Sequence, residues 1–109
     1  MEEFIKGDVV VIPFPFSDLS GSKKRPALVL ADLPGNDIIL CQITSQLNND
    51  KSAIHITSSD FKNGALPVSS YIRPTRIFTA DKNIIIRKAG TVQSSIASQV
   101  SQILIKLFS

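Results

Sequence analysis

The sequence predicts a mainly β domain that ends in one α-helix. Over the first ninety residues, short apolar and β-branched runs alternate with Gly, Pro and Asn, which is typical of a compact antiparallel sheet. The C-terminal segment repeats apolar residues every three or four positions: Ile96, Val100, Ile103, Leu104 and Leu107. This spacing gives a helix one apolar face. We therefore expect a curled antiparallel sheet closed by a C-terminal helix.

Composition indicates one folded domain over residues 1–109. Hydrophobic residues make up 43% of the chain and charged residues 19%, a balance too apolar for a disordered protein. No internal repeat or linker divides the 109 residues. A core of this size gives limited stability, which favours a homodimer.

Net charge, cysteine content and the lack of long apolar runs indicate which partners and which compartment the sequence favours. Twelve Lys and Arg residues against nine Asp and Glu give a net charge of +3, which disfavours a strongly cationic partner. Cys41 is the only cysteine and follows three apolar residues, so we expect core packing in a reducing compartment. No signal-peptide pattern and no run of roughly 20 apolar residues occurs. We expect a cytoplasmic protein with no membrane contact.

The first half of the chain contains three expected strands separated by two polar connections. The strands are Asp8–Phe16, Pro26–Ala31 and Ile38–Thr44, and the connections are Ser17–Lys24 and Leu33–Asp37. Because proline has no amide proton for a sheet ladder, Pro13 and Pro15 predict that the first strand ends at an edge or turns away.

The second half is expected to hold shorter strands before the helix. The expected strands are Ala53–Thr57, Ser69–Ile72, Thr75–Thr79 and Ile84–Arg87, and the expected loops are Asn48–Ser52 and Ser58–Ala65. Pro74 is expected to separate two of these strands, because it cannot donate to a ladder. Ser94 or Ser95 is expected to cap the helix.

The residue content excludes several kinds of catalytic site. The chain has one histidine and one cysteine, so we expect neither a zinc site nor a two-histidine ribonuclease mechanism. The aspartates are spread along the sequence, whereas two-metal catalysis needs converging carboxylates. No glycine-rich phosphate loop occurs. His55 lies inside an expected strand without a nucleophile elbow, so we expect a partly exposed strand histidine. The chain is expected to use no metal and no cofactor.

Three polar segments remain as candidates for binding. The run Lys23–Arg25 precedes Pro26 and forms either an anion site, since arginine matches two phosphate oxygens, or a solubilising loop. Gln42–Gln46, at the end of the third strand, has groups that can orient a phosphate or a ribose hydroxyl; ordinary strand-end polarity is the alternative. Ser69–Phe78 interleaves one tyrosine with two arginines, which suits single-stranded nucleic acid, and equally suits a core tyrosine with surface arginines.

The order of motifs resembles the MazF/PemK toxin family. Gly7–Val10 opens the first strand, and Lys24–Leu30 follows a variable loop with the pattern Arg-Pro-Ala-Leu-Val. The resemblance continues through Gln42–Ser45, Ile77–Lys82 and the terminal helix. It implies an SH3-like barrel of the MazF/PemK/CcdB type that forms a homodimer. It also implies cleavage of single-stranded mRNA at short sequences, and neutralisation by a cognate antitoxin whose tail occupies the RNA groove.

The resemblance also implies roles for individual residues. The family's catalytic arginine corresponds to Arg25 and its catalytic hydroxyl to Thr44. Residues expected to contact the RNA are Lys23, Lys24, Ser45, Gln46, Tyr71, Arg73 and Arg76. The ribose 2′-hydroxyl would attack the adjacent phosphate, so the RNA supplies its own nucleophile and no metal is needed.

Two other functions fit the same barrel. A gyrase-inhibiting toxin would rely on its C-terminal residues, and residues 104–109 lack the tryptophan expected there. A non-catalytic RNA- or protein-binding barrel would not need an intact site. The first loop of this chain is short, and Lys24 stands where several family members carry an acid before the arginine.

Overall fold

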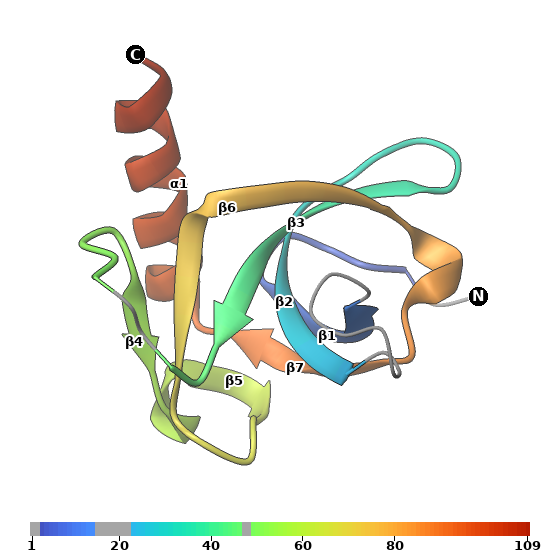
Figure 1. Cartoon of the computed structure of the whole chain (residues 1–109), viewed down its shortest axis with the longest axis horizontal. Coiled ribbons are helices and arrows are strands. Elements are labelled where there is room, and N and C mark those ends of the chain that lie inside the picture. Colours follow the sequence, from blue (N-terminus) through green and yellow to red (C-terminus); the bar gives the residue numbers. More distant parts are fainter. Residues whose placement is uncertain (1–2, 15–22, 47–48) are drawn as a thin grey trace.

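Seven antiparallel strands form one curled sheet, a half-barrel, and one helix packs on it (Figure 1). The structure is a computed structural model that describes residues 3–14, 23–46 and 49–109. The strands are β1 Asp8–Phe14, β2 Lys23–Asp32, β3 Asp37–Thr44, β4 Ile54–Ile56, β5 Phe61–Gly64, β6 Ser70–Asp81 and β7 Arg87–Val92, and the helix is α1 Ser94–Phe108. Their order across the sheet is β4-β6-β3-β2-β1-β7-β5. The predicted mainly β fold with a C-terminal helix is confirmed.

The two faces of the sheet bury separate apolar clusters. One face, here called the helix face, packs Val9, Leu28 and Cys41 with Ile96 and Val100 of α1. The opposite face, here called the inner face, buries a second cluster: Phe4, Val10, Ile12, Ala27, Val29, Ile38 and Leu40. Successive strand residues alternate between the two clusters because side chains on a strand point to opposite sides.

Cys41 is a core residue, as predicted. It is fully buried on the helix face, opposite Leu28 in the β2–β3 register. Burial raises the pKa of its thiol to about 12, because the thiolate would lose its hydration. The side chain therefore packs as a small apolar group.

The Gly-Asp motif before β1 has a structural role. Gly7 has φ +97°, a conformation that L side chains rarely adopt. The Asp8 carboxylate is 1% exposed and accepts hydrogen bonds from the Ile5 amide at 2.9 Å and the Thr91 hydroxyl at 2.8 Å. The Lys88 ammonium lies 3.3 Å from the same carboxylate. The motif thus ties the N-terminal turn to β7.

β6 is one continuous strand, so the break predicted at Pro74 is wrong. The β3–β6 register moves from Gln42–Arg73 directly to Cys41–Ile77, which leaves Pro74 and the next two residues as a bulge. Pro74 is buried there and opposes no residue of β3. The bulge removes the need for a proline amide in the ladder, so the strand continues past it.

Two further boundaries differ from those predicted. The expected loop Ser58–Ala65 contains a short 3₁₀ turn and the edge strand β5, which pairs with β7. The expected strand Ile84–Arg87 is wrong: a 3₁₀ turn over Lys82–Ile84 precedes β7, which runs on through Gly90. β5 has only four residues and all but Phe61 are exposed, so no alternating apolar pattern marks it in the sequence.

β5 and β7 approach each other unusually closely. A Cβ atom on Gly90 would lie 2.5 Å from the Asn63 carbonyl oxygen, and one on Gly64 would lie 2.2 Å from the Ala89 carbonyl oxygen. Gly64 also has φ +68°. Glycine is needed at both positions for this backbone contact.

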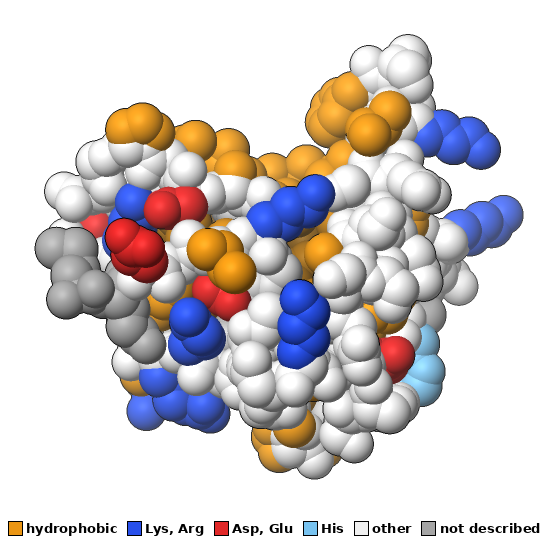
Figure 2. Space-filling model, turned by 180° about the vertical axis from the view of Figure 1, so that it is seen from behind, with side chains coloured by type: hydrophobic (Ala, Val, Ile, Leu, Met, Phe, Trp, Pro, Cys, Tyr) orange, Lys and Arg blue, Asp and Glu red, His pale blue; other side chains and the backbone are white. Residues whose placement is uncertain are grey.

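α1 begins one residue earlier than predicted. Gln93 is the N-cap and makes no side-chain capping bond, while Ser94 and Ser95 already lie in the helix, so the predicted serine cap is wrong. The apolar face packs on the sheet through Ile96 and Val100. Apolar side chains gather again, exposed, at the C-terminal end of the helix (Figure 2): Ile105, Leu107 and Phe108. No helix in the described part of the chain is long and apolar enough to cross a membrane.

Candidate active site

The start of β2 holds the predicted cationic run in a strand. The polar connection was expected to extend through Lys24, but β2 begins at Lys23; residues 17–22 of that connection lie outside the described residues. Lys23 and Lys24 are exposed, and Arg25 is half-buried and paired with Ile12 of β1. Ladder pairing therefore fixes the backbone of Arg25.

Among the described residues, β1 is paired on only one side at this point. Its ladder with β7 stops at Val11, whereas its pairing with β2 continues through Pro13 opposite Lys24. The prediction that Pro13 marks an edge is confirmed, and Pro15 lies outside the described residues. The cationic run thus borders an open side of the half-barrel.

Arg25 and Thr44 lie at the same end of neighbouring strands. The β2–β3 ladder ends at the pair Ala27–Gln42, and Arg25 and Thr44 each stand two residues beyond it. Residues two apart on a strand share a face, so both belong to the inner face with Ala27. Each is half-buried, so neither is sealed under the core.

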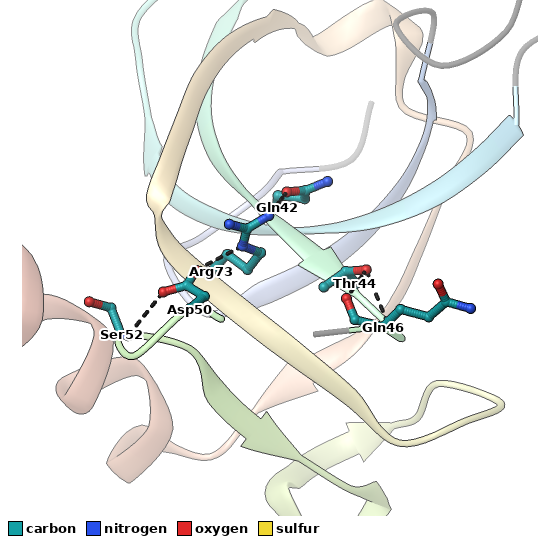
Figure 3. A network of polar contacts seen from close by, with 6 residues as sticks. All are labelled: Gln42, Thr44, Gln46, Asp50, Ser52 and Arg73. Atoms are coloured by element: carbon teal, nitrogen blue, oxygen red, sulfur yellow. Dashed lines mark hydrogen bonds and ion pairs between the residues drawn. The ribbon is translucent and has the colours of Figure 1, made fainter. Parts of the chain in front are cut away.

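The Thr44 hydroxyl is already engaged in a local turn. It donates to the Gln46 carbonyl at 3.1 Å and accepts from the Gln46 amide at 3.2 Å (Figure 3). A threonine hydroxyl has one proton and two lone pairs, so one lone pair stays available. In this arrangement Thr44 can accept one further hydrogen bond. Ser45 and Gln46 follow it as exposed residues.

The inner face continues as polar residues across β6. Thr44 pairs with Tyr71, and Gln42 pairs with Arg73. Tyr71 and Arg73 are both half-buried. This burial fits both interpretations of Tyr71, a ring that binds nucleic acid and a core tyrosine. The residues brought onto this one face are Arg25, Gln42, Thr44, Tyr71 and Arg73.

A buried carboxylate holds Arg73 in place (Figure 3). The Arg73 Nε donates to the Asp50 carboxylate at 2.7 Å, and its Nη1 donates to the Gln42 side-chain oxygen at 3.3 Å. The Asp50 side chain is 8% exposed and also accepts from the Ser52 amide at 2.9 Å. No local pattern predicts this pair, because 23 residues separate Asp50 from Arg73.

The groups around Asp50 favour its ionised form. The hydrogen bond from Arg73 lowers the pKa of Asp50 below its usual 3.8, and the Ser52 amide bond acts in the same direction. The charge of Arg76 lowers it further. Arg76 itself is exposed on the β6 bulge, so it lies near the cluster without joining the paired rows.

A pocket of about 420 Å³ adjoins the same strand ends. Its lining includes the cations Lys24, Arg25 and Arg87, together with Ser45, and contains no acidic residue. The other lining residues are Ser70 and a set of apolar residues: Val11, Pro26, Ile43, Leu66, Pro67, Val68 and Ile86. The sequence did not indicate Arg87 as a site residue; it predicted only the end of a strand there. The pocket suits an anionic group beside an apolar one.

The described residues contain no group of three His, Cys, Asp or Glu side chains placed to hold a metal ion. The chemistry available at the strand ends is therefore that of guanidinium, hydroxyl, amide and aromatic groups.

A family model for PemK-like, MazF-like toxins of type II toxin–antitoxin systems matches residues 5–108. The chain belongs to this family. A search of curated protein sequences gives no match.

Solved structures share the fold. An endoribonuclease in complex with its cognate antitoxin from a mycobacterial species is 15% identical, with a TM-score of 0.75, 95% of this chain covered and 93% of that chain. A MazE–MazF complex from Deinococcus radiodurans is 18% identical, with a TM-score of 0.75 and 94% of both chains covered. The Mycobacterium tuberculosis toxin MazF-mt6 is 12% identical, with a TM-score of 0.69, 93% of this chain covered and 95% of that chain.

Proposed function

We propose that this protein is an endoribonuclease toxin that cleaves single-stranded mRNA at short sequences without a metal ion. The observation that carries the proposal is the placement of Arg25 and Thr44 at one end of neighbouring strands, on one face and partly exposed. Family membership supports it, as do fold relatives that are described as endoribonucleases. A guanidinium and a hydroxyl at the ends of neighbouring strands suit the binding of one phosphodiester.

The reaction requires only the RNA and this face. The ribose O2′ attacks the adjacent phosphorus and the bond from phosphorus to O5′ breaks. The O2′ proton passes to solvent water, and O5′ takes a proton from solvent water. The products are a 2′,3′-cyclic phosphate and a free 5′-hydroxyl. Arg25 stabilises the charge that develops on the phosphate oxygens, an effect of about 10²–10³ in rate for a single well-placed donor.

Thr44 orients the nucleophile in this scheme. Its proton is donated to the Gln46 carbonyl, so the free lone pair accepts from the attacking 2′-hydroxyl. The bond to Gln46 fixes the direction of that lone pair. The hydroxyl thus favours an in-line approach without serving as the base.

Cations around the site hold the RNA strand. Arg73 lies on the same face. Lys23 and Lys24 are exposed at the start of β2, and Arg76 is exposed on the β6 bulge. Contacts of this kind bind phosphates irrespective of sequence and weaken as salt rises. A cognate antitoxin is expected to inhibit by covering this cationic face, and a homodimer is expected in solution, which sedimentation of the purified protein tests.

The decisive experiment compares Arg25→Ala with wild type on a long RNA. We expect a loss of about 10²–10³ in cleavage rate with unchanged thermal unfolding. Lys106→Ala removes a cation from the last turn of α1 and serves as the matched control, with cleavage retained. Sequencing the fragment ends reports the cut sites and the cyclic phosphate together.

Two outcomes contradict the proposal. Wild-type turnover by Arg25→Ala removes the arginine from the mechanism. Absence of cleavage by the wild-type protein, with retained binding of RNA or of gyrase in parallel assays, assigns a binding function to the barrel instead. A 2′-deoxy nucleotide at the cut site should block cleavage, since it removes the nucleophile.

A further inference from the structure

The single histidine of the chain belongs to the same row of residues as the candidate site. His55 on β4 pairs with Tyr71 on β6, and Tyr71 pairs with Thr44 on β3. Paired residues in an antiparallel ladder point to the same side of the sheet. His55, Tyr71 and Thr44 therefore form one cross-strand row on the inner face, whereas the sequence predicted only a partly exposed strand histidine.

The two rings form an open aromatic pair. Their centroids lie 4.9 Å apart and their planes are tilted by 31°. His55 is exposed and Tyr71 is half-buried, whereas the core ring of Phe61 is 7% exposed. No described residue forms a hydrogen bond with the polar atoms of either ring. Such a pair offers both a flat apolar surface and unused donors and acceptors.

The distance between His55 and Thr44 fits a nucleotide next to the phosphate that Thr44 would contact. Two strand spacings separate His55 from Thr44, which is about 10 Å across the sheet. Arg73 lies on the same face, one ladder step of two residues from Tyr71, with its guanidinium fixed by Asp50. An aromatic surface beside a fixed cation is the arrangement that holds single-stranded nucleic acid.

We propose that His55 and Tyr71 form a nucleobase-binding subsite for a nucleotide flanking the phosphate held at Arg25 and Thr44. One base stacks on the paired rings, and the imidazole and phenol tips contact its polar edge. The inference rests on the proposed ribonuclease function. It makes His55 a residue that binds substrate and influences which sequence is cut, with no part in bond breaking.

The test measures kcat and KM separately on a short RNA that carries one mapped cut site. His55→Ala should raise KM about 5- to 150-fold, the equivalent of about 1–3 kcal/mol for one stacked base, with kcat unchanged. His55→Phe keeps the ring and should restore most of the affinity. Thr79→Ala, an exposed change on the same strand β6, is the matched control and should leave KM unchanged.

Substrates with an abasic nucleotide identify the base. At one flanking position, the abasic substitution should raise the KM of the wild-type protein. With that substrate, wild type and His55→Ala should have the same KM. An unchanged KM for His55→Ala overturns the proposal. A raised KM that persists with every abasic substrate also overturns it, because the two rings would then be only a cross-strand packing pair.

Failure of the ribonuclease function is distinguishable from failure of the subsite. If wild type cleaves no RNA, the same variants are compared by equilibrium binding of the single-stranded oligonucleotide. Weaker binding by His55→Ala that His55→Phe restores supports the subsite, and equal dissociation constants overturn it.

Discussion

At the residue scale, the candidate site depends on polar side chains whose partners are set by the fold. Asp50 is the clearest case. Its carboxylate neutralises part of the charge of Arg73 while it fixes the guanidinium beside Gln42. A guanidinium held in this way loses less conformational entropy when it meets a phosphate. The geometry of Arg73 therefore depends on a loop residue far away in the sequence.

Asp50→Asn should lower the free energy of unfolding by about 1–3 kcal/mol at pH 7, since it replaces a charged acceptor of two hydrogen bonds. The pKa of Asp50 is lowered in the folded state, so its stabilisation is complete above pH 3.8 and is lost as the pH falls through the folded pKa. Urea unfolding of both proteins from pH 7 to pH 2 measures this.

The control for Asp50 is Asp37→Asn, at an exposed position at the start of β3. It should change stability by less than about 0.5 kcal/mol. If the difference between wild type and Asp50→Asn stays constant down to pH 2, the ion pair with Arg73 contributes nothing that titrates.

At the element scale, close contact between edge strand β5 and β7 depends on glycine. Gly90→Ala would place a Cβ atom 2.5 Å from the Asn63 carbonyl oxygen, and the neighbour is backbone that cannot rotate away. We expect a loss of about 1–3 kcal/mol, seen as a fall in Tm of roughly 4–12 °C. Differential scanning calorimetry gives the value.

Gly35→Ala is the control that measures the cost of backbone strain without a steric contact. Gly35 has φ +80° but no heavy atom within 4 Å of an added Cβ, so only the conformational cost of about 1 kcal/mol remains. A larger loss for Gly35→Ala than for Gly90→Ala would show that β5 and β7 separate easily.

Removal of an apolar side chain should affect stability differently at the two ends of α1. Ile96→Ala removes a side chain that is 6% exposed against the sheet and should cost about 2–5 kcal/mol. Ile105→Ala removes one that is 69% exposed and should cost less than about 0.5 kcal/mol in a monomer. Chemical denaturation at low protein concentration compares them. An equal cost at both positions would mean that the C-terminal end of the helix is covered in solution.

At the scale of the whole molecule, the described residues supply cations and hydroxyls at one end of the half-barrel and no cluster of metal-binding side chains. We expect cleavage of RNA to continue at an unchanged rate in excess EDTA, because a 2′-hydroxyl nucleophile needs no metal-bound water. The assay is gel analysis of a labelled RNA with and without chelator, beside a DNA of the same sequence. Loss of cleavage in EDTA, restored by Mg²⁺, would contradict this mechanism.

Much of the fold follows from local patterns in the sequence. The β-branched runs of β1, β2 and β3 and the spacing of Ile96 and Val100 in α1 determine where these elements form, because each buries an apolar face. The order of motifs along the chain also predicted the family, and a family model over residues 5–108 confirms that prediction.

Only the tertiary structure decided which polar residues meet. The bulge at Pro74, the edge strand β5, the Asp50–Arg73 pair and the row from Thr44 to His55 all depend on register between distant strands. A local pattern shows which side chains of a strand face the core, but not which residue of a distant strand lies opposite each of them. Arg25 and Thr44 are therefore recognisable in the sequence, whereas the positions of Asp50 and Arg87 beside them are set by the folded sheet.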